Sequence, residues 1–321
     1  MPLLTQTSFK PNIFFKNTHF NTLYRFIFST SAIDFKRERM TTNDADFIDL
    51  DISSVQSESV IIAIHGLEGS SKSSYIQSLT VCANKNEYDV VVMNLRGCSG
   101  EPNKLLSSYH SGKTDDLKQV IDYIIKKKKY KCIHIVGYSL GGNLALKLMG
   151  EFGKEYPEML KTAIGISVPC DLEGSSKVLN RGFNKCYQYG ILKSLLKKAK
   201  HKLNQFPDSG IQKEKLFKVS DFKDFDEFFT APLNSFSSAK DYYTRSSCKP
   251  YLEDIKVSSM MIAALDDSFL STSCYPFKEA KENDNFSLLT PKYGGHVGFY
   301  SGFNKKNNYW LEEQIISFIQ N

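Results

Sequence analysis

The sequence predicts an α/β fold in which helices cover both faces of a mainly parallel, doubly wound sheet. Short runs of β-branched and other apolar residues recur along the chain, and stretches with helical spacing separate most of them. This alternation is typical of βαβ units. The length of 321 residues and the apolar content of 41% are sufficient for one large domain that carries an insertion.

The predicted elements are ordered as this fold requires. Residues 46–52 alternate polar and apolar side chains, which predicts an early, half-exposed strand. Short apolar runs predict buried strands at 60–64, 88–93, 132–136, 162–168, 257–265 and 286–290. Helical spacing predicts helices at 75–83, 114–127, 142–149 and 310–319.

The alternation is interrupted once. Residues 171–256 are helical in pattern, basic and aromatic, with no clear buried strand, so we expect a helical cap inserted between two core strands. The core is then formed by residues 41–170 and 257–321.

Residues 8–30 resemble a transit peptide in being basic and free of acidic residues, but charged residues interrupt their apolar pattern. We therefore expect residues 1–40 to form an ordered arm that packs on the core.

The pentapeptide Gly137-Tyr138-Ser139-Leu140-Gly141 lies between a predicted strand and a predicted helix. A G-x-S-x-G sequence in this context is typical of a nucleophile elbow, where a sharp turn exposes the serine hydroxyl above the sheet. The alternative is an ordinary glycine-rich turn, which the strand–turn–helix context disfavours. The sequence thus predicts an α/β-hydrolase fold with Ser139 as nucleophile.

A serine nucleophile requires a base and an acid, which follow it in this fold in the order acid, then histidine. Two histidines follow Ser139. His201 lies in a strongly cationic predicted helix, whereas His296 lies in a glycine-rich turn after a strand and is the better base. The acid should end the preceding strand, where Asp266 and Asp267 are neighbours. Asp267 is preferred, although both could be simple loop formers.

Acyl transfer also requires donors for the developing oxyanion. The backbone N–H of Leu140, at the start of a helix, is one candidate. The other is the N–H of Leu67, in the loop after an earlier strand. We interpret His65 as a residue that packs this loop, and Cys98 as a poor candidate nucleophile because it does not lie on an elbow.

The composition limits the partners and cofactors. The net charge of +6 is mild, and the basic run at 126–131 closes a predicted helix, so we expect no nucleic-acid partner. Zinc-helix, P-loop and dinucleotide motifs are absent from the sequence, so we expect neither a metal nor a cofactor. Seven scattered cysteines favour reduced thiols and a cytoplasmic location, and no apolar run is long enough for a membrane span.

The cap carries basic residues that are compatible with a weak association with a membrane surface. They could favour anionic head groups, but a solvated helix face is the preferred interpretation. These residues are Lys193, Lys197, Lys198 and Lys200. The oligomeric state does not follow from the sequence.

Several strings resemble the YheT-like α/β-hydrolases, a branch that also contains yeast medium-chain ethyl ester synthase/esterases and animal membrane-associated hydrolases. The similar strings are 17–22, 65–69, 94–103, 109–115, 137–143, 167–172, 266–267 and 294–299. The resemblance implies Ser139, Asp267 and His296 as the catalytic set, and an arm that belongs to the folded domain. The chain departs from the family pattern at Asn21, Ala45 and Ser268, none of which is a member of that set.

We therefore expect a serine carboxylic ester hydrolase, and the resemblance implies short- to medium-chain acyl esters as its small-molecule substrates. Acyl transfer to an alcohol, or phospholipid cleavage, would use the same residues. A non-catalytic ligand-binding protein of the same fold is the rival class.

Overall fold

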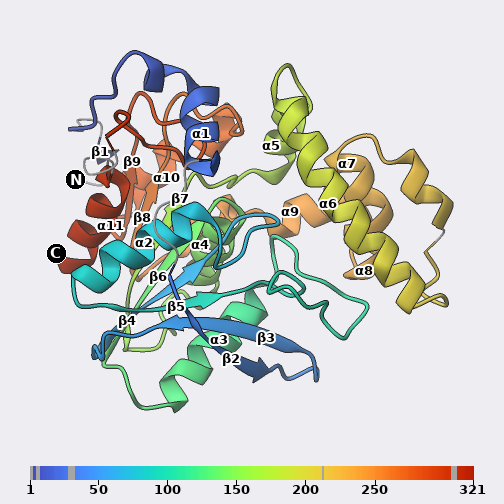
Figure 1. The fold of residues 1–321 in the computed structure, drawn as a ribbon, viewed down its shortest axis with the longest axis horizontal. Coiled ribbons are helices and arrows are strands. Elements are labelled where there is room, and N and C mark those ends of the chain that lie inside the picture. The colour runs from blue at the N-terminus through green and yellow to red at the C-terminus, as the bar shows by residue number, and fades with distance from the viewer. Residues whose placement is uncertain (1–2, 5–7, 28–32, 212, 305–308) are drawn as a thin grey trace.

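The computed structural model describes residues 1–321 except 1–2, 5–7, 28–32, 212 and 305–308. A nine-stranded sheet forms its centre, with the strand order β1-β9-β8-β7-β6-β4-β5-β3-β2 (Figure 1). The pairs on both sides of β3 are antiparallel and the remaining pairs are parallel. The strands are β1 Leu3–Leu4, β2 Lys36–Thr41, β3 Phe47–Ser53, β4 Ser59–Ile64, β5 Asp89–Met93, β6 Cys132–Tyr138, β7 Leu160–Ile166, β8 Ser258–Ile262 and β9 Phe286–Leu289.

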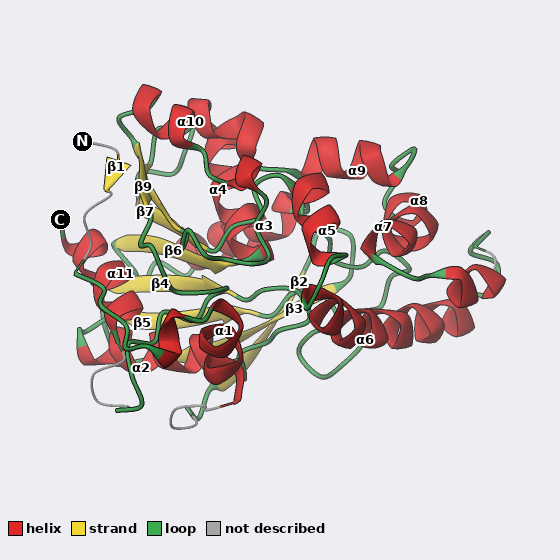
Figure 2. Ribbon diagram, turned by 90° about the horizontal axis from the view of Figure 1, so that it is seen from above, coloured by secondary structure: helices red, strands yellow, loops and turns green. Residues whose placement is uncertain are grey.

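Helices cover both faces of the sheet, so the predicted fold class is confirmed (Figure 2). One face carries α2 (Ser74–Lys85) and α11 (Trp310–Gln320). The other carries α3 (Thr114–Lys126), α4 (Leu140–Phe152) and α10 (Phe277–Glu282). Successive residues of β4 contribute to the two cores in turn, as the period of two in a strand requires.

The cap lies between β7 and β8 in the chain. It projects beyond one end of the strands of the sheet (Figures 1 and 2). It has small apolar clusters of its own, apart from the two cores of the sheet. Its helices are α5 Leu172–Leu179, α6 Asn184–Gln205, α7 Phe222–Phe225, α8 Ala231–Leu233 and α9 Ala239–Ser246, with short 3₁₀ and π segments between and after them.

The arm contains helix α1 (Thr18–Ile27), which lies against the core, and β1, which pairs with β9. Two expectations about this end of the chain were wrong. The boundary at residue 40 falls inside β2, a strand that the sequence did not predict. Strand β3 is mostly buried rather than half-exposed, because Asp49 and Asp51 are buried and pair with Arg39 and Arg37 of β2. Residues 1–2, 5–7 and 28–32 of the predicted arm lie outside the described residues.

Candidate active site

Ser139 occupies the sharp turn between β6 and α4, with a φ of 51° and a ψ of −116°. This backbone conformation is strained for a residue other than glycine. The flanking glycines are required because a Cβ on Gly137 would lie 2.2 Å from the carbonyl oxygen of Gly141. A Cβ on Gly141 would in turn lie 2.4 Å from the carbonyl oxygen of Ile64. The turn therefore has the geometry of a nucleophile elbow.

The structure brings the three predicted residues together. His296 Nε2 lies 3.1 Å from Ser139 Oγ, and His296 Nδ1 lies 2.9 Å from Asp267 Oδ2. Both distances are within hydrogen-bond reach, which is what a base and its orienting carboxylate require. His201 lies on the exposed part of α6, and no hydrogen bond between described residues links it to Ser139.

The two neighbouring acids have different partners. Asp267 contacts the His296 ring and also accepts a hydrogen bond from the Phe269 N–H at 2.9 Å. Asp266 Oδ1 accepts a hydrogen bond from the Gly295 N–H at 2.9 Å, so it holds the backbone beside the histidine. Burial, and secondarily the charge of Asp267, raise the pKa of Asp266 to about 6. Of the two acids, Asp267 is the one whose carboxylate contacts the histidine ring.

The loop after β4 lies directly beside the nucleophile. A Cβ on Gly66 would lie 3.3 Å from the Cβ of Ser139, so this loop approaches the serine as closely as a glycine allows. Leu67 follows Gly66, and Leu140 is the first residue of α4. No hydrogen bond between described residues uses the N–H of either leucine. Both donors are thus available to a ligand oxygen.

His65 holds this loop in place, as the sequence analysis expected. Its ring is fully buried, and its Nε2 accepts a hydrogen bond from the Leu95 N–H at 3.0 Å. Its Nδ1 therefore carries the proton and donates to the Gly66 carbonyl at 2.7 Å. Burial lowers the pKa of His65 to about 4, so the ring is neutral at pH 7.

The arm contacts the loop that carries His296. Thr22 Oγ1 accepts a hydrogen bond from the His296 N–H at 2.8 Å, and Asn21 exchanges two hydrogen bonds with the backbone of Tyr300. Arg25 donates to the Gly298 carbonyl at 3.2 Å. No pattern in the sequence indicated these contacts, although the string at 17–22 is one of those that resemble the YheT-like family.

A cavity of about 700 Å³ lies between the core and the cap and reaches the Ser139 and His296 side chains. This volume is in the range of small-molecule binding sites. The cap contributes apolar side chains to its wall, such as Leu172, Leu195 and Phe229, and also charged ones, such as Lys198, Lys202 and Asp226. The arm contributes Phe26.

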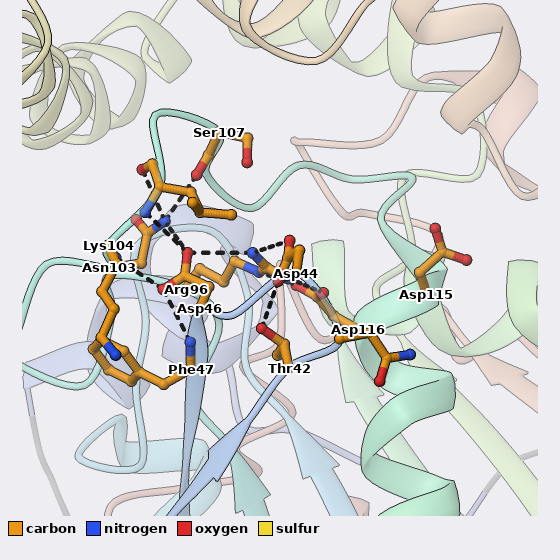
Figure 3. Close-up of polar contacts among 12 residues, drawn as sticks. Thr42, Asp44, Asp46, Phe47, Arg96, Asn103, Lys104, Ser107, Asp115 and Asp116 are labelled. Atoms are coloured by element: carbon orange, nitrogen blue, oxygen red, sulfur yellow. Dashed lines mark hydrogen bonds and ion pairs between the residues drawn. The ribbon is translucent and has the colours of Figure 1, made fainter.

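A buried ionic network holds the loop after β5, which forms another wall of the cavity (Figure 3). The Arg96 guanidinium lies 2.6 Å from Asp116, 2.8 Å from Asp44 and 3.2 Å from Asp46. Asp46 also accepts a hydrogen bond from Asn103 Nδ2 at 2.7 Å. Although burial opposes its ionisation, the hydrogen bond with Arg96 lowers the pKa of Asp44 to about 2. The network therefore holds Arg96 and Asn103, at the two ends of this loop.

One of the cap lysines is not simply solvated. Lys198 Nζ lies 2.7 Å from Glu68 Oε1 and 3.2 Å from Cys98 Sγ, so it connects α6 to two loops of the core. Lys193, Lys197 and Lys200 are exposed, as the solvated interpretation predicts. Burial raises the pKa of the Cys98 thiol to about 11, which disfavours a thiolate nucleophile there.

Comparison with known proteins gives consistent results. The sequence profile of a family described as alpha/beta hydrolase fold matches residues 59–302. The chain is 33% identical to YheT of Escherichia coli (strain K12) over 97% of this chain and 92% of that protein. It is 27% identical to the human protein named Phospholipase ABHD3, over 99% of this chain and 80% of the relative.

A yeast (Saccharomyces cerevisiae) protein named Monoacylglycerol lipase is 24% identical over 84% of this chain and 60% of that protein. Among solved structures, the Pyrococcus furiosus esterase PF2001 superposes with a TM-score of 0.60 at 16% identity, covering 89% of this chain and 91% of that one. At this identity the superposition shows the fold alone. Within the described part of the chain, no helix has the length and apolar character needed to cross a membrane.

Proposed function

Because the chain belongs to the alpha/beta hydrolase fold family, and within it to the YheT-like hydrolases, we propose that it is a serine carboxylic ester hydrolase. The observation that carries the proposal is the position of His296, whose two ring nitrogens lie within hydrogen-bond distance of Ser139 and Asp267. A histidine so placed can take the serine proton while the carboxylate stabilises the imidazolium that forms.

The proposed reaction has two halves. Ser139 Oγ attacks the ester carbonyl and transfers its proton to His296, and the N–H groups of Leu67 and Leu140 stabilise the oxyanion. The alcohol leaves with the proton from His296, which yields an acyl-enzyme on Ser139. A water molecule deprotonated by His296 then attacks the acyl group, and the acid leaves as Ser139 regains its proton.

The substrate class is proposed from the cavity and the relatives. An apolar space of about 700 Å³ suits a short- to medium-chain acyl group. Two relatives carry the names Phospholipase ABHD3 and Monoacylglycerol lipase, and both names describe hydrolysis of lipids. Transfer of the acyl group to an alcohol requires only that the alcohol replace water in the second half of the reaction.

The proposed compartment remains the cytoplasm. The seven cysteines are free thiols in the structure, and Cys82, Cys170, Cys248 and Cys274 among them are buried. A reducing compartment suits this arrangement because it keeps thiols unpaired.

Labelling with a fluorophosphonate probe tests the proposal, because the probe reacts with an activated serine. We expect wild-type protein to be labelled and Ser139→Ala and His296→Ala to lose labelling, whereas His201→Ala keeps it. Hydrolysis of p-nitrophenyl esters of increasing chain length should fall by at least about 10³-fold in Ser139→Ala. Absence of labelling in the wild type, or equal labelling of Ser139→Ala, would instead indicate the non-catalytic alternative.

A further inference from the structure

Helix α1 is oriented with its polar side toward the core. Its buried side chains include Asn21, Thr22 and Arg25. Its apolar side chains face solvent, and the exposed fractions of Phe26 and Ile27 are 68% and 67%. A surface helix of a globular domain normally has the opposite arrangement. The apolar side of α1 is therefore largely exposed in the described part of the chain.

Neighbouring segments extend this exposed apolar face. The ring of Phe14 lies 5.7 Å from that of Phe303, and the ring of Phe20 lies 6.2 Å from the same ring. We call the whole face the apolar arm surface. It consists of Ile13, Phe14, Phe20, Leu23, Phe26, Ile27 and Phe303. Contiguous exposed patches of this kind mark interaction sites.

The charge around the apolar arm surface is positive. Residues 1–33 contain no aspartate or glutamate. Lys10 and Lys16 are exposed, and the Nζ atoms of Lys16 and Lys292 lie 5.7 and 5.3 Å from the centre of the Tyr293 ring. Exposed aromatic and aliphatic side chains flanked by lysines favour binding to the interface of an anionic bilayer.

The apolar arm surface is also continuous with the candidate active site. Phe26 belongs both to this surface and to the cavity wall. His19 of α1 contacts Tyr187 on α6 of the cap and Phe183, which directly precedes this helix, so the arm lies beside the cap (Figures 1 and 2). A molecule held at the arm would lie next to the space that leads to Ser139.

We propose that the apolar arm surface docks the protein on a bilayer that contains anionic lipids. Phe14, Phe20 and Ile27 enter the interfacial region, while Lys10 and Lys16 contact the lipid phosphates. A second copy of the chain fits less well, because a two-fold contact would bring the same lysines together without acidic residues from the arm to neutralise them. The further step, in which the bilayer supplies acyl esters to the cavity, rests on the proposed function. Docking itself does not.

Vesicle sedimentation with the full-length Ser139→Ala protein tests docking independently of catalysis. We expect binding to vesicles of phosphatidylcholine with 30% phosphatidylglycerol, and much weaker binding to phosphatidylcholine alone.

Phe14→Ser should lower the partition coefficient between vesicle and water by about tenfold, because about half of a Phe side chain leaves the interface. The matched control is Phe217→Ser, an exposed phenylalanine of the cap (91% exposed), and it should bind like the parent. Lys16→Gln should lower binding about fivefold on anionic vesicles only.

Three results would overturn docking: no binding to anionic vesicles, equal losses in Phe14→Ser and Phe217→Ser, or a concentration-dependent dimer that Phe14→Ser dissociates. The last result would assign the surface to a second copy. Hydrolysis of soluble p-nitrophenyl butyrate by the Phe14→Ser enzyme, with Ser139 intact, should equal that of the wild type. This readout reports on the proposed function alone, so the two proposals can fail separately.

Discussion

The arm and the cap both border the candidate catalytic residues, but they contact different parts of the core. The arm is joined to the loop of His296 by buried hydrogen bonds with defined partners, such as the one from the His296 N–H to Thr22. The cap has apolar clusters of its own, and its contacts with the core include buried hydrogen bonds between Tyr242 and Ser111 and the ion pair of Lys198 with Glu68. The arm therefore holds the loop of the proposed base, while the cap forms much of the wall of the cavity.

The largest expected effect comes from breaking the ion pair that anchors the arm. Arg25 and Glu312 are 2% and 0% exposed and pair directly. Arg25→Met would leave the Glu312 carboxylate buried without its cation, so we expect the free energy of unfolding to fall by about 3–5 kcal/mol. Urea denaturation measures this loss.

The double variant Arg25→Met/Glu312→Leu should recover most of that stability, because neither charge is then buried alone. The control is Lys177→Met, which breaks an exposed pair with Glu173 and should change the free energy of unfolding by less than about 1 kcal/mol. A loss of similar size in Lys177→Met and Arg25→Met would mean that the arm is not part of the cooperative core.

The next effect concerns catalysis rather than stability. Thr22→Val keeps the shape of the side chain but removes the acceptor for the His296 N–H. We expect kcat to fall about 10- to 100-fold with little change in KM, because the base is displaced while the acyl cavity is intact. Thr22→Ser retains the hydroxyl and should restore most of the activity. If Thr22→Val kept its kcat, the arm would have no positioning role.

The central fold and the three residues at the elbow, the acid loop and the histidine loop could be predicted from the sequence. Each of these residues follows a predicted strand, and the carboxyl ends of neighbouring parallel strands meet at one edge of a sheet. Strand order therefore converts positions in the chain into proximity in space. The contact between Thr22 and His296 joins residues 274 positions apart and is accompanied by no periodic pattern, so the sequence alone did not indicate it.

Two further features were missed for physical reasons. Strand β2, Lys36–Thr41, is rich in charged residues and has no apolar run, but it pairs with β3 and its arginines bind aspartates there. Helix α1 was not predicted, because charged and polar residues interrupt its apolar pattern, and its polar side faces the core. Three polar residues determine that orientation because their hydrogen-bond partners lie in the His296 loop and in α11.

The smallest expected effect tests whether the cap lacks the charge compensation that the arm has. Burial raises the pKa of Asp226 to about 7, although Thr230 and Tyr243 donate hydrogen bonds to it. The folded state therefore keeps this proton between pH 3.8 and about 7, while the unfolded state loses it. The free energy of unfolding consequently falls across that interval and levels off above it.

Asp226→Asn removes the ionisation, so this variant should be about 1–2 kcal/mol more stable than wild type at pH 8. The gain is smaller than the full pKa shift would give, because part of the carboxyl faces the cavity. Denaturation at pH 8 and pH 4.5 measures the difference, which should shrink at the lower pH, while the exposed Asp208→Asn should show no such trend. A gain that is the same at both pH values would instead assign the effect to packing and remove the electrostatic contrast between the cap and the arm.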